Sequence, residues 1–188
     1  MEEDQLGLLI EALRFASEKH SGQFRKGDGS VPYINHPIAV LQLLYETGCL
    51  EYDVLIASVL HDVMEDSYVP QSELASIFGS DVAALVAEVT DDMSASREER
   101  KRAQTENAEF LSYKAKQIRI ADKICNVRDI TNDELDWDLS TKLRYLDWAD
   151  AVVEGCRGVN PVLDALFEET VGKVRRSLAE GSNEEFLL

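Results

Sequence analysis

The chain has 188 residues, 45% of them hydrophobic, and its 19 basic and 36 acidic side chains give a formal net charge of −17. This length and composition suit one globular domain with a proper core. The negative charge argues against a general nucleic-acid or anionic-membrane surface, because phosphate backbones require a basic footprint. It does not exclude a small phosphorylated ligand held by a local basic patch or a metal.

The three cysteines, Cys49, Cys125 and Cys156, lie far apart in the sequence and form no CxxC pair. This pattern argues against a zinc knuckle or a disulfide framework and suits free thiols in a reducing cytosol. The N-terminus lacks the basic start of a signal peptide, and no apolar run approaches a membrane span. We therefore expect a soluble, cytoplasmic protein.

Helical periodicity recurs along the chain, and strand-like alternation does not persist. We expect an all-α, single-domain fold over residues 1–188, with its functional core at about residues 8–157. The acidic stretch Thr131–Leu139 reads as a loop, and Gly181–Leu188 as a frayed end. The expected helices are Asp4–His20, Pro37–Thr47, Tyr52 to about Met64, Pro70–Phe78, Asp81–Thr90, Ser96–Glu109, Lys114–Ile130, Ser140–Cys156 and Asn160–Pro161 to about Leu178.

Ser21–Tyr33 is expected to be a loop, because glycine and proline interrupt any regular element there. Its adjacent Arg25 and Lys26 are either a candidate anion contact or a solvated surface pair. Asn35 is a candidate helix cap and Pro37 fits a first helical turn, which would hold His36 at a rigid helix entrance. His36 is therefore either a ligand or a structural residue.

The segment from Val54 to Asp66 passes from an apolar run straight into four ionisable residues. On a helix, His61 and Glu65 share one face, and so do Asp62 and Asp66. Three acids and an imidazole at the end of an apolar helix are costly to desolvate alone. A divalent cation suits them, because it binds carboxylate oxygen and neutral imidazole together. Alternatively, the helix simply reaches solvent here, with His61 at its boundary.

Later polar residues also have two interpretations. Asp122 lies in an apolar setting with Asn126 one turn on, and alone it is better read as salt-bridged than as metal-bound. Tyr145 and Trp148, at i and i+3, suit either the core or an aromatic lip over a ligand base.

His20 reads as a capping or packing residue. The charge-rich Ser96–Glu109 segment reads as an exposed helix with alternating charge.

Together these segments resemble the HD superfamily of metal-dependent phosphohydrolases. The resemblance is closer to the hydrolase domain of the RelA/SpoT proteins, and closest to the stand-alone small alarmone hydrolases, a group that includes the metazoan SpoT homologue. It runs from about residue 8 to residue 157. Its landmarks are Gln23–Gly27, Pro32–Pro37, Leu60–Asp66, Glu88–Asp92, Ala121–Asp129 and Tyr145–Ala149.

The resemblance implies a manganese ion in an all-α fold, and a reaction that removes the 3′-pyrophosphate from (p)ppGpp, giving GDP or GTP. Such a reaction lowers alarmone levels in the stringent response. By the family pattern the metal ligands are His36, His61, Asp62 and Asp122. Glu65 and Asp66 would orient or deprotonate the attacking water. The positions that contact nucleotide and phosphates in the family are Arg25, Lys26, Asn126 and Tyr145.

The chemistry agrees with that pattern, since a divalent ion lowers the pKa of bound water and a mixed histidine and carboxylate set with open positions suits Mn²⁺. The chain ends too early for the synthetase and regulatory domains of bifunctional members, so we expect hydrolysis only. Other interpretations keep the site but use (p)ppApp or the 2′-phosphate of NADPH, or make the protein a catalytically silent nucleotide-sensing module. A structural zinc protein is the weakest option. The native metal and the oligomeric state stay open.

Overall fold

The computed structural model describes residues 2–27, 29–131 and 135–185. Within these ranges the expected all-α fold is confirmed, and the chain adds to its helices only an isolated antiparallel bridge between Phe24 and Pro32. In this part of the chain, no helix is long and apolar enough to cross a membrane. The helices are α1 (Glu2–Lys19), α2 (Asn35–Glu46), α3 (Tyr52–Leu60), α4 (Val63–Asp66), α5 (Gln71–Phe78), α6 (Ser80–Val89), α7 (Arg97–Asn107), the 3₁₀ helix η1 (Ala108–Phe110), α8 (Tyr113–Asp129), α9 (Leu139–Glu154) and α10 (Pro161–Glu185).

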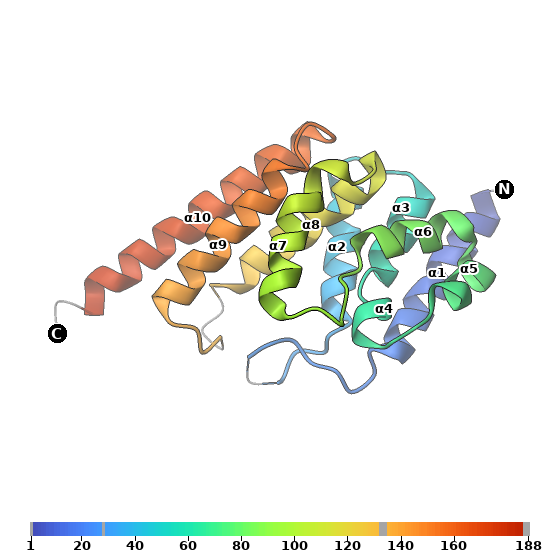
Figure 1. Cartoon of the computed structure of the whole chain (residues 1–188), viewed down its shortest axis with the longest axis horizontal. Helices are drawn as coiled ribbons and strands as arrows, with labels where there is room; N and C mark the ends of the chain where they lie inside the picture. The colour runs from blue at the N-terminus through green and yellow to red at the C-terminus, as the bar shows by residue number, and fades with distance from the viewer. Residues whose placement is uncertain (1, 28, 132–134, 186–188) are drawn as a thin grey trace.

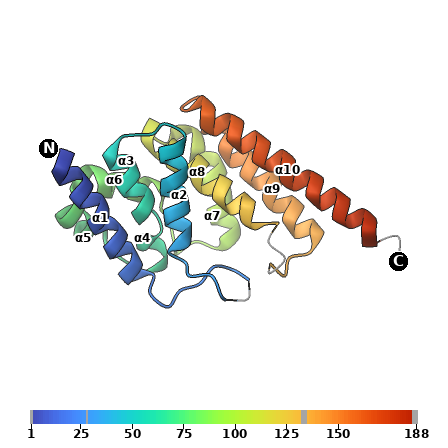
Figure 2. The same ribbon diagram turned by 180° about the vertical axis from the view of Figure 1, so that it is seen from behind.

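The fold is built around α8, which packs against α2, α3, α6, α9 and α10. Every residue from Gln117 to Cys125 is buried, and so is the segment Val54–Leu60 of α3. Figures 1 and 2 both show α9 and α10 side by side at one end of the molecule, with α1, α5 and α6 at the other. The buried apolar residues form one continuous core, so the helices of both ends belong to a single packed unit.

Several helices begin where the sequence offers a cap. The side chains of Ser96, Ser112 and Asp138 accept hydrogen bonds from backbone N–H groups in the first turns of α7, α8 and α9. Asn160 does the same for α10, accepting from the backbone of Val162 at 3.1 Å. These local signals fix where the long helices start, and the apolar faces then decide how they pack.

The expected central helix is wrong in one respect that matters for function. It does not run unbroken to Met64, because α3 ends at Leu60 and α4 begins at Val63. Asp62 has φ −99° and ψ −8°, in the sparsely populated bridge region of backbone conformation. The Asp66 N–H still donates to the Asp62 carbonyl at 2.8 Å. The ionisable residues therefore lie on a kinked turn, and His61 and Asp62 occupy the break itself.

Two other boundaries also differ from expectation. Asn35 does not cap α2, because it is the first helical residue and the preceding Ile34 makes no side-chain capping bond. Pro37 lies in the first turn, as expected. The last helix passes Leu178 and Gly181 and continues to Glu185, so the frayed end predicted from Gly181 is wrong up to that residue. Of the remaining expectations, the loop at 132–134 and the frayed end at 186–188 fall outside the described residues.

The end of α9 packs tightly against η1. A Cβ added at Gly155 would lie 2.7 Å from Ala108 Cβ and 3.0 Å from the Glu109 backbone nitrogen. We expect Gly155→Ala to lower the free energy of unfolding by about 1–3 kcal/mol, because neither neighbour is the flexible end of a side chain. Thermal unfolding measures this. Gly7→Ala in α1 is the matched control, since its Cβ would meet no atom within 4 Å. An unchanged melting temperature for Gly155→Ala would contradict the described packing.

Candidate functional site

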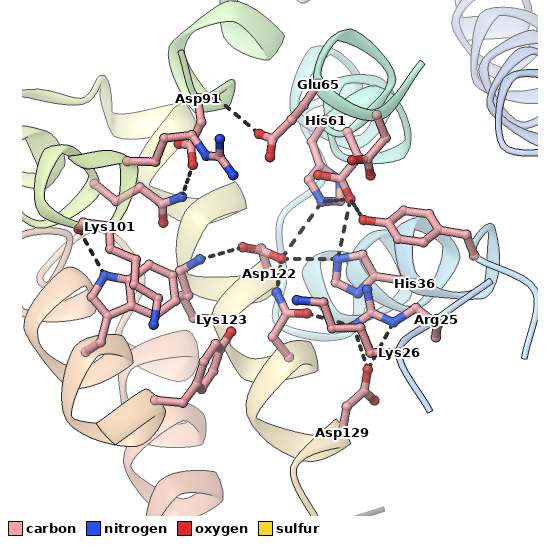
Figure 3. A pocket seen from close by; sticks show the side chains of 18 of the residues that line it. Arg25, Lys26, His36, His61, Glu65, Asp91, Lys101, Asp122, Lys123 and Asp129 are labelled. Atoms are coloured by element: carbon pink, nitrogen blue, oxygen red, sulfur yellow. Dashed lines mark hydrogen bonds and ion pairs between the residues drawn. The ribbon is translucent and has the colours of Figure 1, made fainter. Parts of the chain in front are cut away.

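Two histidines and two aspartates from three separate segments converge at the centre of the molecule (Figure 3). His36 comes from the start of α2, His61 and Asp62 from the break between α3 and α4, and Asp122 from α8. Ligand atoms of His36, His61 and Asp62 all lie within 4.8 Å of one another. Asp122 Oδ1 lies 3.1 Å from His36 Nε2 and 3.9 Å from His61 Nε2. The fold therefore assembles four ligand-type side chains around one point.

The donor atoms of this cluster fit a divalent metal ion. His61 Nδ1 lies 2.7 Å from the Ser58 carbonyl and must donate to it, so in neutral His61 the lone pair is on Nε2. Within the described part of the chain that buried Nε2 has no hydrogen-bond partner, although Asp62 Oδ2 lies 3.0 Å away. Two lone pairs facing each other require a cation or a proton between them. Adjacent ligands of an octahedral ion with bonds of about 2.1 Å are about 3 Å apart, close to the 3.0 Å from His61 Nε2 to Asp62 Oδ2 and the 3.1 Å from His36 Nε2 to Asp122 Oδ1.

Electrostatics around the cluster show how strongly it attracts positive charge. Burial lowers the pKa of His61, but the carboxylates of Asp62 and Asp122 outweigh it and raise this pKa to about 9. Burial raises the pKa of Asp122, but Lys123 and the two histidines outweigh it and hold the value well below its usual range. Without a metal the cluster therefore keeps both aspartates charged and holds a proton on His61. A metal must compete with that proton.

A second layer of residues orients the aspartates. Tyr33 donates its hydroxyl to Asp62 Oδ2 at 2.8 Å. Lys123 Nζ donates to Asp122 Oδ2 at 3.1 Å, and Asn126 Nδ2 donates to Asp122 Oδ1 at 2.5 Å. Asn126 thus projects from the same side as Asp122, as the spacing predicted. Asp122 is both salt-bridged, through Lys123, and directed at the histidines, so its two interpretations are not exclusive.

Two further acids, Glu65 and Asp66, lie beside the cluster on α4. Burial and the neighbouring carboxylates of Asp91 and Asp62 raise the pKa of Glu65 to about 7. Burial, with Asp62 second, also raises the pKa of Asp66. A carboxylate with a pKa near neutrality can accept a proton in one step and release it in another. Glu65 is therefore suited to general acid–base chemistry.

The cluster opens into a cavity of about 370 Å³ whose lining includes every candidate residue. Lys101 and Lys123 lie beside the Trp148 ring, on the side of Asp122 away from His36, whereas Arg25 lies at the histidine end and donates to Asn126 (Figure 3). The lining cations come from the Ser21–Tyr33 loop, α7 and α8. An acidic protein with such a cavity can attract an anion to one place while repelling it elsewhere. The site residues predicted from sequence that line this cavity are Arg25, Lys26, His36, His61, Asp62, Glu65, Asp66, Asp122, Asn126 and Tyr145.

Comparison with known proteins agrees with this geometry. A model of the HD domain matches residues 12–144, which span the metal-type cluster and the cavity. The chain belongs to the HD-domain family. Membership, together with the cluster of His36, His61 and Asp62, implies dependence on a divalent metal.

Several relatives of this HD domain align over nearly their whole length. The guanosine-3′,5′-bis(diphosphate) 3′-pyrophosphohydrolase MESH1 of Xenopus tropicalis is 43% identical over 163 residues, covering 86% of this chain and 91% of that protein. Human MESH1 is 42% identical over 158 residues, covering 83% and 88%. The bifunctional (p)ppGpp synthase/hydrolase SpoT of Escherichia coli is 35% identical over 134 residues, which are 68% of this chain and 19% of SpoT. The expected kinship with the small alarmone hydrolases is confirmed.

Solved structures give the same result for the fold. A metazoan SpoT orthologue, described as hydrolysing ppGpp, superimposes with a TM-score of 0.84 at 40% identity, over 88% of this chain and 94% of that one. The protein lmo0812 of Listeria monocytogenes gives a TM-score of 0.62 at 26% identity, over 74% of this chain and 97% of that one. The single-domain HD fold is therefore shared along most of the chain.

Sequence reasoning missed the role of α7 in this HD domain. The expectation of a merely exposed helix is wrong for one face, which lines the cavity with Arg97, Arg100, Lys101 and Gln104. No residue of α7 is fully buried, so the apolar pattern that normally reveals an inward face is absent. Tyr33 and Lys123 were also missed as site residues. Their only sequence signal was proximity to His36 and Asp122.

The aromatic residues of α9 belong to both cavity and core. Tyr145 and Trp148 line the cavity, and both also pack against the buried core. The Trp148 indole N–H donates to the Lys101 carbonyl at 3.0 Å, which ties α9 to α7. Lys101 Nζ and Lys123 Nζ lie 4.8 Å and 4.5 Å from the centre of the Trp148 ring, within reach of a cation–π interaction. Burial, with Arg97, Lys26 and Lys123 nearby, lowers the pKa of Lys101.

Arg25 and Lys26, the basic pair of the Ser21–Tyr33 loop, make different contacts. Arg25 is engaged, because its guanidinium donates to Asp129 Oδ2 at 2.5 Å and to Asn126 Oδ1 at 2.7 Å. Lys26 makes no ion pair among the described residues, and its Nζ lies 5.9 Å from the centre of the Trp137 ring. Burial and the nearby arginines lower the pKa of Lys26. Lys26 is therefore available to bind an incoming anion. Arg25 could bind an anion only by keeping or giving up its hydrogen bonds to Asp129 and Asn126.

His20 behaves as the packing residue that its position suggested. It is buried, its ring lies 4.9 Å from the Tyr33 ring, and its Nδ1 lies 2.6 Å from Gln23 Oε1. Gln23 Nε2 in turn donates to the Asp66 carbonyl at 3.1 Å. His20 thus supports the end of α4 through Gln23 rather than joining the metal-type cluster.

The pKa of Glu65 supplies a testable pH effect. Asp91→Asn removes a negative charge that raises this pKa, so the pKa of Glu65 should fall. If Glu65 acts in its ionised form, the acidic limb of the kcat–pH profile should move to lower pH than in the wild type. Steady-state kinetics between about pH 5 and pH 9 measure this, a range that brackets the Glu65 pKa. A limb that stays in place, or moves to higher pH, would argue against Glu65 as the titrating group.

Proposed function

We propose that this HD domain is a Mn²⁺-dependent (p)ppGpp 3′-pyrophosphohydrolase, which yields GDP or GTP and pyrophosphate and so lowers alarmone levels. The observation that carries the proposal is the alignment of the chain, along most of its length, with MESH1 hydrolases at about 40% identity. The convergence of two imidazoles and two aspartates beside a cationic cavity supports it independently.

The metal would be held by His36, His61, Asp62 and Asp122. Mixed imidazole and carboxylate ligands with open positions suit Mn²⁺, and a bound divalent ion would supply an activated water and a Lewis acid for the phosphate oxygens. Tyr33, Lys123 and Asn126 fix the carboxylates through the hydrogen bonds described above. Such outer partners set the orientation of ligands and commonly matter for metal affinity.

The protein side chains would then carry out the proton transfer and charge stabilisation. Glu65 accepts a proton from the attacking water, since its raised pKa makes it a competent base near neutral pH. Asp66, one residue on, helps to orient that water. The water oxygen forms a new bond to the phosphorus attached to O3′, the P–O3′ bond breaks, and O3′ becomes a hydroxyl of the nucleoside by gaining a proton, which the release of a proton from Glu65 balances. One water is consumed for each pyrophosphate released.

The cationic side chains of the cavity would bind the remaining phosphates of the nucleotide. Lys26 and Lys101 have no ion-pair partner among the residues that the structure describes, so an anion entering the cavity displaces no existing salt bridge there. Tyr145 offers an aromatic face beside Lys101. Arg25 and Asn126, already joined to each other, would contact the substrate at the metal end. A phosphate with several negative oxygens suits this set of donors.

We further propose a cytosolic location. The cysteines Cys49, Cys125 and Cys156 are buried free thiols, which suits a reducing compartment.

The test is to incubate purified protein with ppGpp and Mn²⁺ and to identify the products by ion-exchange chromatography and pyrophosphate detection. The expected result is GDP and pyrophosphate in equal amounts, with turnover abolished by a chelator and restored by Mn²⁺. Orthophosphate as the released product, or nucleotide binding without turnover, would contradict the proposal. Parallel reactions with (p)ppApp and NADPH distinguish the alternative substrates, because NADPH would release orthophosphate.

A further inference from the structure

Glu65 lies on α4, a helix of only four residues, and its carboxylate is held from outside that helix. The backbone N–H of Asp91 donates to Glu65 Oε2 at 3.3 Å, across the cavity wall (Figure 3). A hydrogen bond of this length is near its limit, so a small shift of the Asp91 backbone would break it and release the Glu65 carboxylate. The residues that hold the segment around Asp91 are therefore relevant to the reaction.

That segment is held on two sides. On one side, Arg119 of α8 donates to the Val89 carbonyl at 2.8 Å, at the last residue of α6. On the other side, Gln104 of α7 donates its side-chain amide to Asp91 Oδ2 at 2.6 Å. Gln104 is thus the contact between Asp91 and the helix that carries the cavity cations.

The Gln104 contact is not explained by stability alone. Asp91 offers only acceptor oxygens, so the Gln104 amide must present its NH₂ group to Asp91 and leave its oxygen elsewhere. That oxygen, Oε1, is buried and has no hydrogen-bond partner among the residues that the structure describes. Leaving a buried acceptor unpaired typically costs about 1–3 kcal/mol. An unpaired buried polar group beside reactive groups is typical of functional sites, where the usual pairing of buried polar groups is given up for activity.

α7 also contributes more cations to the cavity lining than any other element. It contributes Arg97, Arg100 and Lys101 to the cavity, has no fully buried residue, and packs mainly on α9 and η1. Its position relative to α6 therefore depends on polar contacts such as that of Gln104.

We propose that Gln104 is a positioning residue that couples the cationic helix α7 to the general base. Through Asp91, it fixes the backbone N–H that orients the Glu65 carboxylate toward the attacking water. This inference rests on the proposed function for Glu65. It predicts that Gln104 affects kcat, through Glu65, and that it does not affect substrate affinity.

A double-mutant cycle tests the coupling. Gln104→Met keeps the length of the side chain but removes the donor, and should lower kcat about tenfold with KM changed by less than about twofold. In the Glu65→Gln background the same change should lower kcat by less than about twofold, since the residue it acts through is already lost. Gln42→Met, an exposed glutamine on α2, is the matched control and should leave both constants unchanged. Equal losses of kcat in both backgrounds, or a rise in KM alone, would overturn the proposal.

A conservative pair at Asp91 provides a second test. Asp91→Asn keeps an oxygen that accepts from Gln104 and should retain at least about a third of kcat at its optimal pH, whereas Asp91→Ala should lose about tenfold. Comparable losses in the two variants would show that the Gln104–Asp91 bond is not what matters.

A measurement without substrate separates this inference from the proposed function. Hydrogen exchange followed by NMR should show the Asp91 amide at least about tenfold less protected in Gln104→Met than in the wild type, at equal global stability. Unchanged protection would overturn the inference even if ppGpp is hydrolysed. Lost protection in a protein that does not hydrolyse ppGpp would refute the proposed function and leave the positioning contact standing.

Discussion

Asp122→Ala is expected to abolish both metal binding and turnover. Asp122 is 7% exposed, and its Oδ1 lies within reach of both imidazoles of the cluster. Its removal would take away a proposed ligand and would also leave buried Lys123 without its carboxylate partner. Loss of a metal ligand at a hydrolytic site should lower kcat/KM by about 10³-fold or more, since the ion supplies several kcal/mol of transition-state stabilisation. Bound Mn²⁺ by mass spectrometry and turnover of ppGpp measure the two effects.

The control for this variant is Asp129→Asn, on the same helix. Asp129 pairs with Arg25 and lies outside the ligand cluster, so its variant should keep one metal per chain. Circular dichroism and thermal unfolding establish that Asp122→Ala remains folded, which is necessary because an unpaired buried lysine is destabilising. A folded Asp122→Ala protein that keeps full metal content or full activity would refute the assigned ligand set.

Glu65→Gln is expected to separate catalysis from metal binding. The amide keeps the size of the side chain and its acceptor for the Asp91 N–H, but it cannot take a proton from water. We expect unchanged metal content, KM within about threefold and kcat lower by about 10²–10⁴-fold, the range for losing a general base.

Glu73→Gln is the matched control, because it makes the same chemical change in a surface ion pair with Lys19. Such pairs contribute little to stability, and this one lies outside the cavity, so kinetics should not change. Normal kcat in Glu65→Gln would remove Glu65 from the mechanism. Loss of metal in the same variant would instead make Glu65 a ligand.

Much of the fold could be predicted because local and long-range signals agree. The apolar stripe of α8 and the apolar run of α3 identify buried helices, and caps such as Ser96 mark where helices begin. The break at His61 and Asp62 could not be predicted, because the residues on both sides have a helical pattern. Only the tertiary setting decides that the backbone turns there.

For the candidate site, the polar residues within apolar segments were the informative ones. His61, Asp62 and Asp122 stand out because a buried segment does not normally carry charge. The cavity cations of α7 and the contact from Gln104 to Asp91 carry no such signal, since a polar helix beside a polar cavity looks the same in sequence as a polar helix beside solvent. Asp91 itself becomes informative only when the fold places its N–H beside Glu65.

The most direct test of the central claim is a crystal structure of the protein with Mn²⁺, using the anomalous signal of manganese to locate the ion. We expect one peak bounded by His36 Nε2, His61 Nε2 and carboxylate oxygens of Asp62 and Asp122, at about 2.0–2.3 Å from each. A peak at another place, or no peak in this cluster at saturating Mn²⁺, would contradict the proposed metal centre and the hydrolase mechanism that depends on it.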